Sequence, residues 1–202
     1  MTGIAAMGSI IEHIRAATRE DAAAIAAIYA PYVRDTAISF ETVPPDEVQM
    51  ADRILKVIPR LPWLVHEAGG RVTGYAYAGP HRERAAYRWS VDAGIYLDSN
   101  AHRQGIGTAL YATLFAALRM QGYHRVYGGI TLPNTASVGL HEAHGFKPIG
   151  VYGEVGFKLG AWHDVGWWGL DLAPTNHEPG DPLPLTADIL DRAKRVAGGG
   201  IA

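Results

Sequence analysis

The amino-acid sequence predicts a single mixed α/β domain. Hydrophobic residues make up 48% of the 202 residues and charged residues 19%, which is typical of a globular chain and excludes general disorder. Short apolar runs with strand-like residue types recur along the chain, and between them apolar residues repeat at helical spacing. We expect the domain to cover residues 10–173, a usual length for one domain.

The two ends of the chain differ from this domain. Residues 1–9 are small and weakly patterned, so we expect a flexible N-terminus. Residues 174–202 form a Pro- and Gly-rich C-terminal extension, which contains one short amphipathic segment, Thr186–Val196. One interpretation of this extension is that it docks on a partner subunit, but it carries no chemical motif that defines a role.

The first predicted strand covers Ile10–Ala16. A helix then begins at Thr18, because Thr18 suits the N-cap position and Asp21 suits the third helical position of a capping box. We expect Pro31 to end or bend this helix. One helical face is formed by Ile25, Ile28, Tyr29 and Tyr32.

A second helix begins at Pro44-Pro45-Asp46-Glu47 and ends before Pro59 and Pro62. Its expected apolar side is formed by Val48, Ile54, Leu55 and Ile58. Two strands, Trp63–Glu67 and Arg71–Ala78, follow it, and Gly69-Gly70 between them predicts a hairpin. Gly79-Pro80 is expected to break the second strand and to begin a basic loop.

The clearest helix covers Gly105–Gln121, because apolar residues repeat along one side of it and Gly122 follows its end. The other elements of the second half are strand Tyr87–Leu97, strand Arg125–Thr131, helix Asn134–His144 and strands Phe146–Val155 and Trp162–Leu172. The predicted order is therefore β-α-α-β-β-β-α-β-α-β-β, which is that of a mixed α/β domain.

Composition also restricts the function. The 18 basic and 20 acidic side chains give a net charge of −2, so charge alone would not hold nucleic acid or an anionic membrane. Cysteine is absent, which excludes disulfides, cysteine-based zinc sites, iron–sulfur clusters and a cysteine acyl-enzyme. No apolar run is long enough to span a bilayer, and Met1–Ile11 lacks the features of a secretory signal. We expect a soluble, cytoplasmic protein.

The strongest local signal is a strand that ends with Ile95, Tyr96 and Leu97 and runs through a short loop into the long helix. A helix N-terminus leaves backbone N–H groups unpaired, and glycines there let an anion approach them. We therefore expect a phosphate or pyrophosphate to bind at this turn, where Arg103 adds a charge and Thr108 a hydroxyl. The candidate site comprises Arg103, Gln104, Gly105, Ile106, Gly107 and Thr108.

Three known phosphate-binding patterns compete for this glycine pair. The dinucleotide fingerprint requires glycine where Leu110 stands, and the P-loop requires a Gly-Lys-Ser/Thr sequence that is missing. The remaining pattern is Arg/Gln-x-x-Gly-x-Gly/Ala, with His102 in the first place and Arg103 beside it. A structural alternative is that the glycines only loosen the start of the helix.

The remaining pattern resembles the pyrophosphate-binding motif of the GNAT superfamily of N-acetyltransferases. A second block resembles the later half of the same core, namely Asn134-x-x-Ser137-x-x-Leu140-His141-x-x-x-Gly145-Phe146. This resemblance implies the GNAT fold, a mixed and mostly antiparallel central sheet flanked by helices. It also implies acetyl-CoA as the acetyl donor and no metal.

A closer resemblance covers roughly Ile14 to Leu172 and is to the phosphinothricin and methionine sulfoximine N-acetyltransferases. It implies acetyl transfer to the α-amine of a small amino acid analogue by a homodimer, with neither nucleic acid nor membrane as partner. It rests on the stretches Tyr75–Pro80, Ala86–Trp89, Leu140–Phe146 and Gly156-Phe157-Lys158-x-Gly160-x-Trp162-His163-Asp164-Val165-Gly166.

The resemblance further implies roles for single residues. Asp92 matches an acidic residue, usually Glu, that the close relatives use as general base through water. His141 replaces the usual tyrosine acid and would protonate the departing thiolate or assist deprotonation, so which of the two is the base stays open. Asn134 would hold the pantetheine arm, together with backbone groups of the strand ending at Leu97. The structural alternatives are an ion-paired Asp92, a helix-packing His141 and an N-cap Asn134.

The acceptor amino acid needs a partner for its carboxylate. Arg82 and Arg84 of the basic loop are candidates for a bidentate clamp, and Phe40 and Tyr87 for the walls of the pocket. The alternative for the arginines is a solvated surface loop.

The sequence also bears on a zinc site and on alternatives to amino-acid acetylation. The sequence His141-Glu142-Ala143-His144 differs from the zinc motif H-E-x-x-H, because its histidines are three residues apart and not four. The alternatives to amino-acid acetylation are acetylation of another small amine or of a protein N-terminus, and a non-catalytic sensor that binds acyl-CoA.

Overall fold

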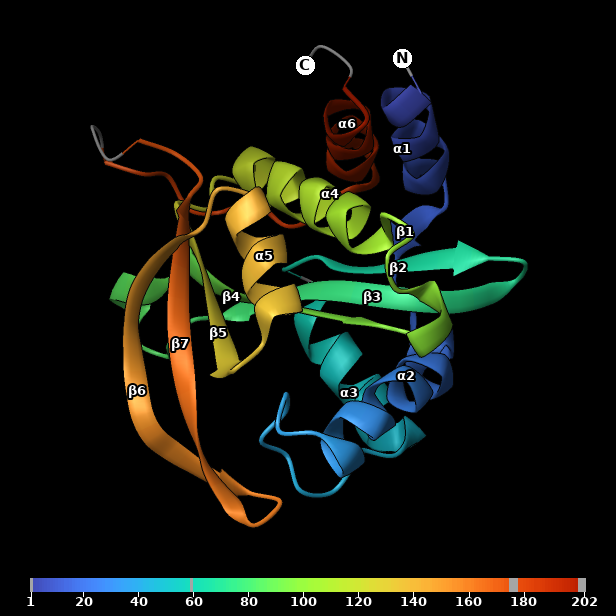
Figure 1. Cartoon of the computed structure of the whole chain (residues 1–202). Coiled ribbons are helices and arrows are strands. Elements are labelled where there is room, and N and C mark those ends of the chain that lie inside the picture. The colour runs from blue at the N-terminus through green and yellow to red at the C-terminus, as the bar shows by residue number, and fades with distance from the viewer. Residues whose placement is uncertain (1, 59, 175–177, 200–202) are drawn as a thin grey trace.

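The computed structural model describes residues 2–58, 60–174 and 178–199. Its centre is a seven-stranded sheet with the spatial order β1-β2-β3-β4-β5-β7-β6 (Figure 1). Among the strands of the described residues only β4 and β5 pair in parallel, so the expected mixed and mostly antiparallel sheet is confirmed. The strands are β1 (Ile14–Ala16), β2 (Trp63–Ala68), β3 (Arg71–Pro80), β4 (Ser90–Leu97), β5 (Arg125–Leu132), β6 (Lys147–Lys158) and β7 (Ala161–Asp171).

Helices cover both faces of the sheet. Helices α4 (Ile106–Gln121) and α5 (Thr135–Ala143) lie on one face, and α2 (Ala22–Asp35) and α3 (Glu47–Val57) lie on the other (Figure 1). Alternate residues of β3 pack into the two cores on either side of the sheet, because successive side chains of a strand point to opposite faces. Ala76 and Ala78 belong to the core that contains α4, whereas Tyr75 belongs to the core of α2 and α3.

The N-terminal segment differs from the expectation. The structure places a helix, α1 (Thr2–Glu12), where a flexible segment and the start of a strand were predicted, so the strand covers only Ile14–Ala16. Ile11 is buried, and Met7 and Ile10 pack against the core of α4. Contacts with a helix remote in sequence therefore stabilise α1, and local residue patterns do not reveal such contacts.

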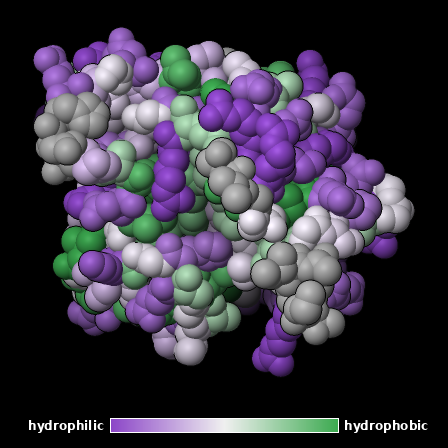
Figure 2. Space-filling model, turned by 90° about the horizontal axis from the view of Figure 1, so that it is seen from above, coloured by the Kyte–Doolittle hydropathy of each residue, from purple (hydrophilic) through white to green (hydrophobic). Residues whose placement is uncertain are grey.

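The amphipathic segment near the C-terminus forms helix α6 (Ala187–Ala197), which packs on α4 of the same chain. Ile189 and Ala193 are buried against Ala116 and Ala117, so its apolar side is covered without a partner subunit. Seen from above, hydrophilic residues cover most of the surface of this side, and hydrophobic residues appear in smaller patches between them (Figure 2).

The two helices below the sheet correct the sequence analysis in detail. Pro31 lies inside α2, which continues to Asp35, because Tyr29 and Val33 on either side of it are buried in the same core. In α3 the predicted apolar side is partly wrong, since Val48 and Leu55 are exposed. Ile54 is buried as predicted, together with Met50 and Ala51.

The limits of β3 and β4 in the structure also differ from the predicted ones. Gly79 and Pro80 do not break β3, because they pair with Asp92 and Val91 of β4. Strand β4 begins at Ser90 and not at Tyr87, since Ala85–Tyr87 form the short 3₁₀ helix η2. The loop between β3 and β4 is therefore a compact turn that starts and ends at paired residues.

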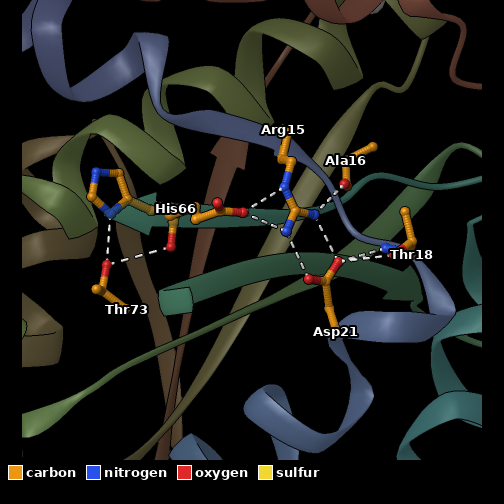
Figure 3. Close-up of polar contacts among 7 residues, drawn as sticks. Arg15, Ala16, Thr18, Asp21, His66 and Thr73 are labelled. Carbon is orange, nitrogen blue, oxygen red and sulfur yellow. Dashed lines mark hydrogen bonds and ion pairs between the residues drawn. The ribbon is translucent and has the colours of Figure 1, made fainter. Parts of the chain in front are cut away.

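An ion-pair network joins the edge strand to the first helices (Figure 3). The Arg15 guanidinium on β1 donates to Asp21 and to Glu67 of β2, with a shortest distance of 2.7 Å to each carboxylate. The same Asp21 carboxylate accepts the backbone N–H of Thr18, which completes the predicted capping box. Beside it, the His66 imidazole and the Thr73 hydroxyl lie 2.6 Å apart. These contacts position the start of α2.

A buried lysine ties the loop after α2 to the β6–β7 hairpin. The Lys158 ammonium donates to the backbone carbonyls of Val33 (2.6 Å) and Ser39 (2.5 Å), and the side chain is almost fully buried. Removing the ammonium would leave two buried carbonyl groups without this donor.

We expect Lys158→Met to lower the free energy of unfolding by about 1–3 kcal/mol, because unsatisfied buried carbonyls carry a desolvation cost. Urea unfolding followed by circular dichroism measures this change. Lys147→Met, on the exposed start of the same strand, is the control and should change stability much less. Equal losses for the two variants would contradict the role of the two carbonyl bonds.

Candidate active site

The two parallel strands at the centre of the sheet separate part-way along their length. Strand β4 pairs with β5 only through Ser90, Val91 and Asp92, which face Arg125, Val126 and Tyr127. Beyond this point the strands diverge (Figure 1), and in the described part of the chain no strand pairs with this side of Ala93–Leu97. This fork leaves backbone N–H and C=O groups of β4 available for an extended ligand.

The predicted strand residues Ile95, Tyr96 and Leu97 line this unpaired stretch. The side chains of Ile95 and Leu97 pack against the core of α4. Tyr96 points to the other face, where its ring contacts those of Tyr29 and Tyr32. The Leu97 carbonyl already accepts the Tyr32 hydroxyl at 2.7 Å. The backbone of residues 93–96 is therefore the freer part of this edge.

Helix α4 begins beyond the end of β4 with an uncapped N-terminus. Gly105 is the N-cap residue, with a left-handed φ of +82°, and it forms no side-chain cap. The first-turn N–H groups, including those of Ile106 and Thr108, thus remain available to an anion. Arg103 and Thr108 are exposed beside them. The Gln104 amide instead turns back to donate to the Asn100 carbonyl at 2.6 Å.

The second glycine of this turn has different surroundings. A Cβ on Gly107 would lie 3.5–3.6 Å from side-chain carbons of Leu140, Ile95 and Leu97. Gly107 therefore faces the sheet and α5 and allows α4 to pack closely on them. Gly107 thus has a packing role, whereas Gly105 shapes the uncapped end of the helix.

Asn134 lies at the far side of the fork, after the end of β5. Its side-chain oxygen accepts the backbone N–H of Ser137 at 3.0 Å, so Asn134 is the N-cap of α5. This is the structural role anticipated for it.

Asp92 occupies the last position at which β4 pairs with β5, at the apex of the fork. Its carboxylate lies 2.6 Å from Nδ1 of His81, which follows the end of β3. Burial raises the pKa of the Asp92 carboxyl, and the hydrogen bond with His81 opposes that rise. The His81 ring stacks on Tyr127 of β5, with ring centroids 4.3 Å apart.

His81 is the functional candidate that the sequence analysis missed. The sequence predicts only that this residue belongs to the basic loop after Pro80. The signal that identifies it is strand register: Gly79 pairs with Asp92 in the β3–β4 pair, so the chain leaves β3 beside Asp92. That register is defined only when both strands and the turn between them are in place.

His141 lies on the opposite face of the sheet from Asp92. Its ring contacts the position that a Cβ on Gly128 would occupy, between Val126 and Ile130, which pack with α4. Nδ1 of His141 lies 2.8 Å from the Ser137 carbonyl, and Nε2 lies 3.2 Å from the Tyr111 hydroxyl. Burial lowers the pKa of this imidazole. The structure thus does not bring the two candidate catalytic residues together.

A cavity of about 1,020 Å³ opens on the α2–α3 side of the sheet, between α3 and the β3–β4 loop. His81, Arg82, Arg84 and Tyr87 line it. Phe40 is not among its lining residues, because its ring packs over Gly156 of β6. The predicted acceptor arginines and Tyr87 therefore meet at one cavity beside His81, whereas Phe40 lies apart from them.

Neither a metal cluster nor a membrane-spanning helix is found in the part of the chain that the structure describes. In residues 2–58, 60–174 and 178–199, no three His, Asp or Glu side chains converge as metal ligands. None of the described helices combines the length and apolar character that a bilayer span needs.

Comparisons with known proteins agree with this geometry. The family model described as an acetyltransferase (GNAT) domain matches residues 14–167. The chain belongs to this GNAT family. The match covers the fork, the α4 turn and the cavity, so the resemblance inferred from the two sequence motifs is confirmed.

Relatives of this GNAT acetyltransferase include enzymes named for small amino acid analogues, and one solved structure, from Brucella melitensis, is named a ribosomal-protein-alanine N-acetyltransferase, with 34% identity and a TM-score of 0.75 over 78% of this chain and 98% of that one. The phosphinothricin N-acetyltransferase of Streptomyces viridochromogenes is 39% identical over 85% of this chain and 92% of its own length. The L-methionine sulfoximine/L-methionine sulfone acetyltransferase of Pseudomonas aeruginosa is 32% identical over 82% and 98%. A GNAT phosphinothricin acetyltransferase from Sinorhizobium meliloti, solved with acetyl-CoA, superposes with a TM-score of 0.80 at 33% identity, covering 83% of this chain and 92% of that one.

Proposed function

We propose that this protein transfers the acetyl group of acetyl-CoA directly to the α-amine of a small amino acid or analogue, of the phosphinothricin or methionine sulfoximine type, in the cytoplasm. The observation that carries this proposal is the position of the cavity. It is lined by His81, whose Nδ1 lies 2.6 Å from Asp92 at the apex of the fork between β4 and β5. The names of the relatives support the same substrate class.

The residues of the fork fit acetyl-CoA. The uncapped N-terminus of α4 suits its pyrophosphate, and Arg103 and Thr108 lie beside that end. The unpaired edge of residues 93–96 suits the amide groups of its pantetheine arm, as one more strand would. Acetyl-CoA supplies an activated acetyl group on a thiol that can leave.

The protein's own contribution is to position and deprotonate the amine. An α-amine is mostly an ammonium at neutral pH and must lose a proton before it can attack a carbonyl carbon. Asp92 is the carboxylate that supports this loss, because it lies at the apex of the fork and bonds to His81, which lines the cavity. His141, buried on the other face, packs between α4 and α5, and we assign it a structural role.

The cavity lining selects an anionic acceptor. Its basic side chains outnumber its acidic ones, and one of them, Arg53, is neutralised by Glu41 at 2.7 Å. Arg88 pairs with Asp181 at 3.3 Å, and Glu83 is the second acidic residue of the lining. The basic side chains that remain are Lys56, Arg60, Arg82 and Arg84. Guanidinium groups bind carboxylates and phosphinates with two parallel hydrogen bonds, so an amino acid with a second acidic or strongly polar group suits this lining.

A panel of amines with acetyl-CoA, followed by thiol release, tests the proposed function. We expect turnover with phosphinothricin, methionine sulfoximine or methionine sulfone, and little with peptides that present a free N-terminus. Turnover with peptides or simple amines alone would contradict the acceptor class. Tight acetyl-CoA binding without thiol release for any amine would indicate a sensor.

Replacing Arg82 and Arg84 by alanine should raise the KM of the acceptor about tenfold or more, because each charge-assisted hydrogen bond contributes roughly 1.5–3 kcal/mol. The KM of acetyl-CoA should change by less than about twofold in the same steady-state assays. Arg71→Ala, at the exposed start of β3, is the matched control. The opposite pattern of KM changes would place the two arginines on the donor side.

We also propose that the protein is a homodimer that pairs through the β6–β7 hairpin. Strand β6 is the last strand of the sheet. Val151, Phe157 and Trp162 on this hairpin are each more than half exposed, which is an apolar surface that monomers rarely present. Phe157 and Trp162 contact each other, with ring centroids 5.4 Å apart.

Phe157→Asp should convert a dimer to a monomer in sedimentation experiments at micromolar concentration, because a carboxylate would be buried without a partner at that interface. Val48→Asp, at an exposed apolar position on α3, should leave the mass unchanged. A monomeric wild-type protein would refute this arrangement.

A further inference from the structure

We propose that His81 is the base that accepts the proton of the acceptor amine and that Asp92 is the residue that positions His81. This inference rests on the proposed function and adds to it the atom that takes the proton, Nε2 of His81.

Contacts on three sides hold the His81 ring. Nδ1 lies 2.6 Å from the Asp92 carboxylate, and one ring face stacks on Tyr127 at 4.3 Å. The rings of Tyr87 and Trp167 meet its edges at 5.8 and 6.3 Å. A ring held in this way has one orientation, and among the described residues none forms a hydrogen bond to Nε2.

The cavity reaches the histidine and not the carboxylate. His81 is a lining residue, and Asp92 is not, although the Asp92 side chain is 37% exposed and that of His81 is 14% exposed. An amine whose carboxylate is held by Arg82 or Arg84 therefore meets the imidazole before it meets Asp92. The Asp92 side chain is also one methylene shorter than that of glutamate. The His81 imidazole fills the resulting gap between the Asp92 carboxylate and the acceptor amine.

Chemistry favours the same assignment. The ordinary pKa of an imidazole is about 6.5 and that of a carboxyl group is about 4. Neutral imidazole is therefore the stronger base for removing a proton from an ammonium group. With Nδ1–H donated to Asp92, the lone pair of Nε2 is free to take a proton. The Asp92 carboxylate then stabilises the imidazolium by charge, as an orienting acid does for a catalytic histidine.

Protons and bonds balance in this scheme. The ammonium of the acceptor loses one proton to Nε2 of His81, which later releases it to solvent. The amine nitrogen then bonds to the acetyl carbon as the carbon–sulfur bond breaks. The second proton lost from that nitrogen goes to the departing sulfur, so the products are an N-acetyl amino acid, a free thiol and one proton.

His81→Asn is the main test, because asparagine keeps an N–H donor near Asp92 and lacks any atom at the Nε2 position. We expect kcat/KM for the acceptor to fall by about 10²-fold or more, while the Kd of acetyl-CoA measured by calorimetry stays within about twofold. His13→Asn, exposed at the surface, is the matched control and should behave as wild type. The double variant with Asp92→Asn should be no slower than the slower single variant, because the two residues act as one unit.

A result within about threefold of wild type for His81→Asn, with Asp92→Asn strongly impaired, would overturn the proposal and leave Asp92 acting through water. A wild-type protein that acetylates no amine would instead refute the proposed function. Nitrogen NMR of the histidines in the wild-type protein provides a readout that does not depend on activity or on a variant. We expect neutral His81 to carry its proton on Nδ1, and a proton on Nε2 would overturn the assignment.

Discussion

Asp92→Asn is expected to lower turnover at neutral pH by about 10²–10⁴-fold, the usual contribution of general base catalysis, because that catalysis depends on the Asp92 carboxylate. Asparagine has nearly the same shape, but it has no negative charge with which to support proton removal from the amine. In the structure this residue stands at the apex of the β4–β5 fork and bonds to His81. Steady-state assays with the preferred acceptor of the panel measure the loss.

Two further variants make this result specific. Asp171→Asn removes a strand carboxylate that pairs with Arg125, at the paired end of β4 and β5 and outside the cavity lining, and should keep full turnover. Asp92→Glu restores the charge on a longer side chain and should recover part of the activity lost in Asp92→Asn. Near-normal turnover of Asp92→Asn would remove Asp92 from the proton-transfer step.

Gly105→Val is expected to weaken acetyl-CoA binding by about 100-fold, measured as Kd by calorimetry. Gly105 has a φ of +82°, a region that β-branched residues strongly avoid, so valine would rebuild the turn that presents the first N–H groups of α4. A Cβ at this position would also lie 3.3 Å from the Ile10 side chain of α1. Losing one or two charge-assisted hydrogen bonds to a phosphate costs about 3 kcal/mol, which is close to 100-fold in Kd.

The other end of the same helix offers a matched control. Gly122 is the C-cap of α4, with a φ of +87°, and no atom lies within 4 Å of a Cβ added there. Gly122→Val therefore introduces similar backbone strain, of about 1–2 kcal/mol, without touching the fork. We expect its Kd for acetyl-CoA to stay within about twofold of wild type. Equal affinities for the two variants would show that the α4 N-terminus does not bind the pyrophosphate.

Local signals predicted many element boundaries well. The capping box at Thr18, the start of the second helix after Asp46 and the glycines that flank α4 lie where the sequence indicated. Each of these signals acts through atoms only a few residues apart, so neighbouring residue types are enough to specify it. The same holds for the two motifs that identified the GNAT family.

Segments whose structure depends on contacts with distant parts of the chain were predicted less well. Helix α1 is stabilised because Ile11 is buried in the core that contains α4. Helix α2 continues past Pro31 because residues on both sides of Pro31 are buried. Burial of this kind depends on surfaces from other parts of the chain. Patterns within a short window therefore predicted a strand where residues 10–12 are helical, and they did not show that the helix continues past Pro31.

The sequence by itself determined the family, the fold class, the uncapped glycine turn and a list of candidate polar residues. Only the tertiary structure decided which of these residues meet. It separates Asp92 from His141 by the thickness of the sheet and brings His81 to within 2.6 Å of Asp92. The physical reason is strand register. Successive side chains of a strand alternate between the two faces of the sheet, and the pairing of β3, β4 and β5 determines which side chains lie together on the same face.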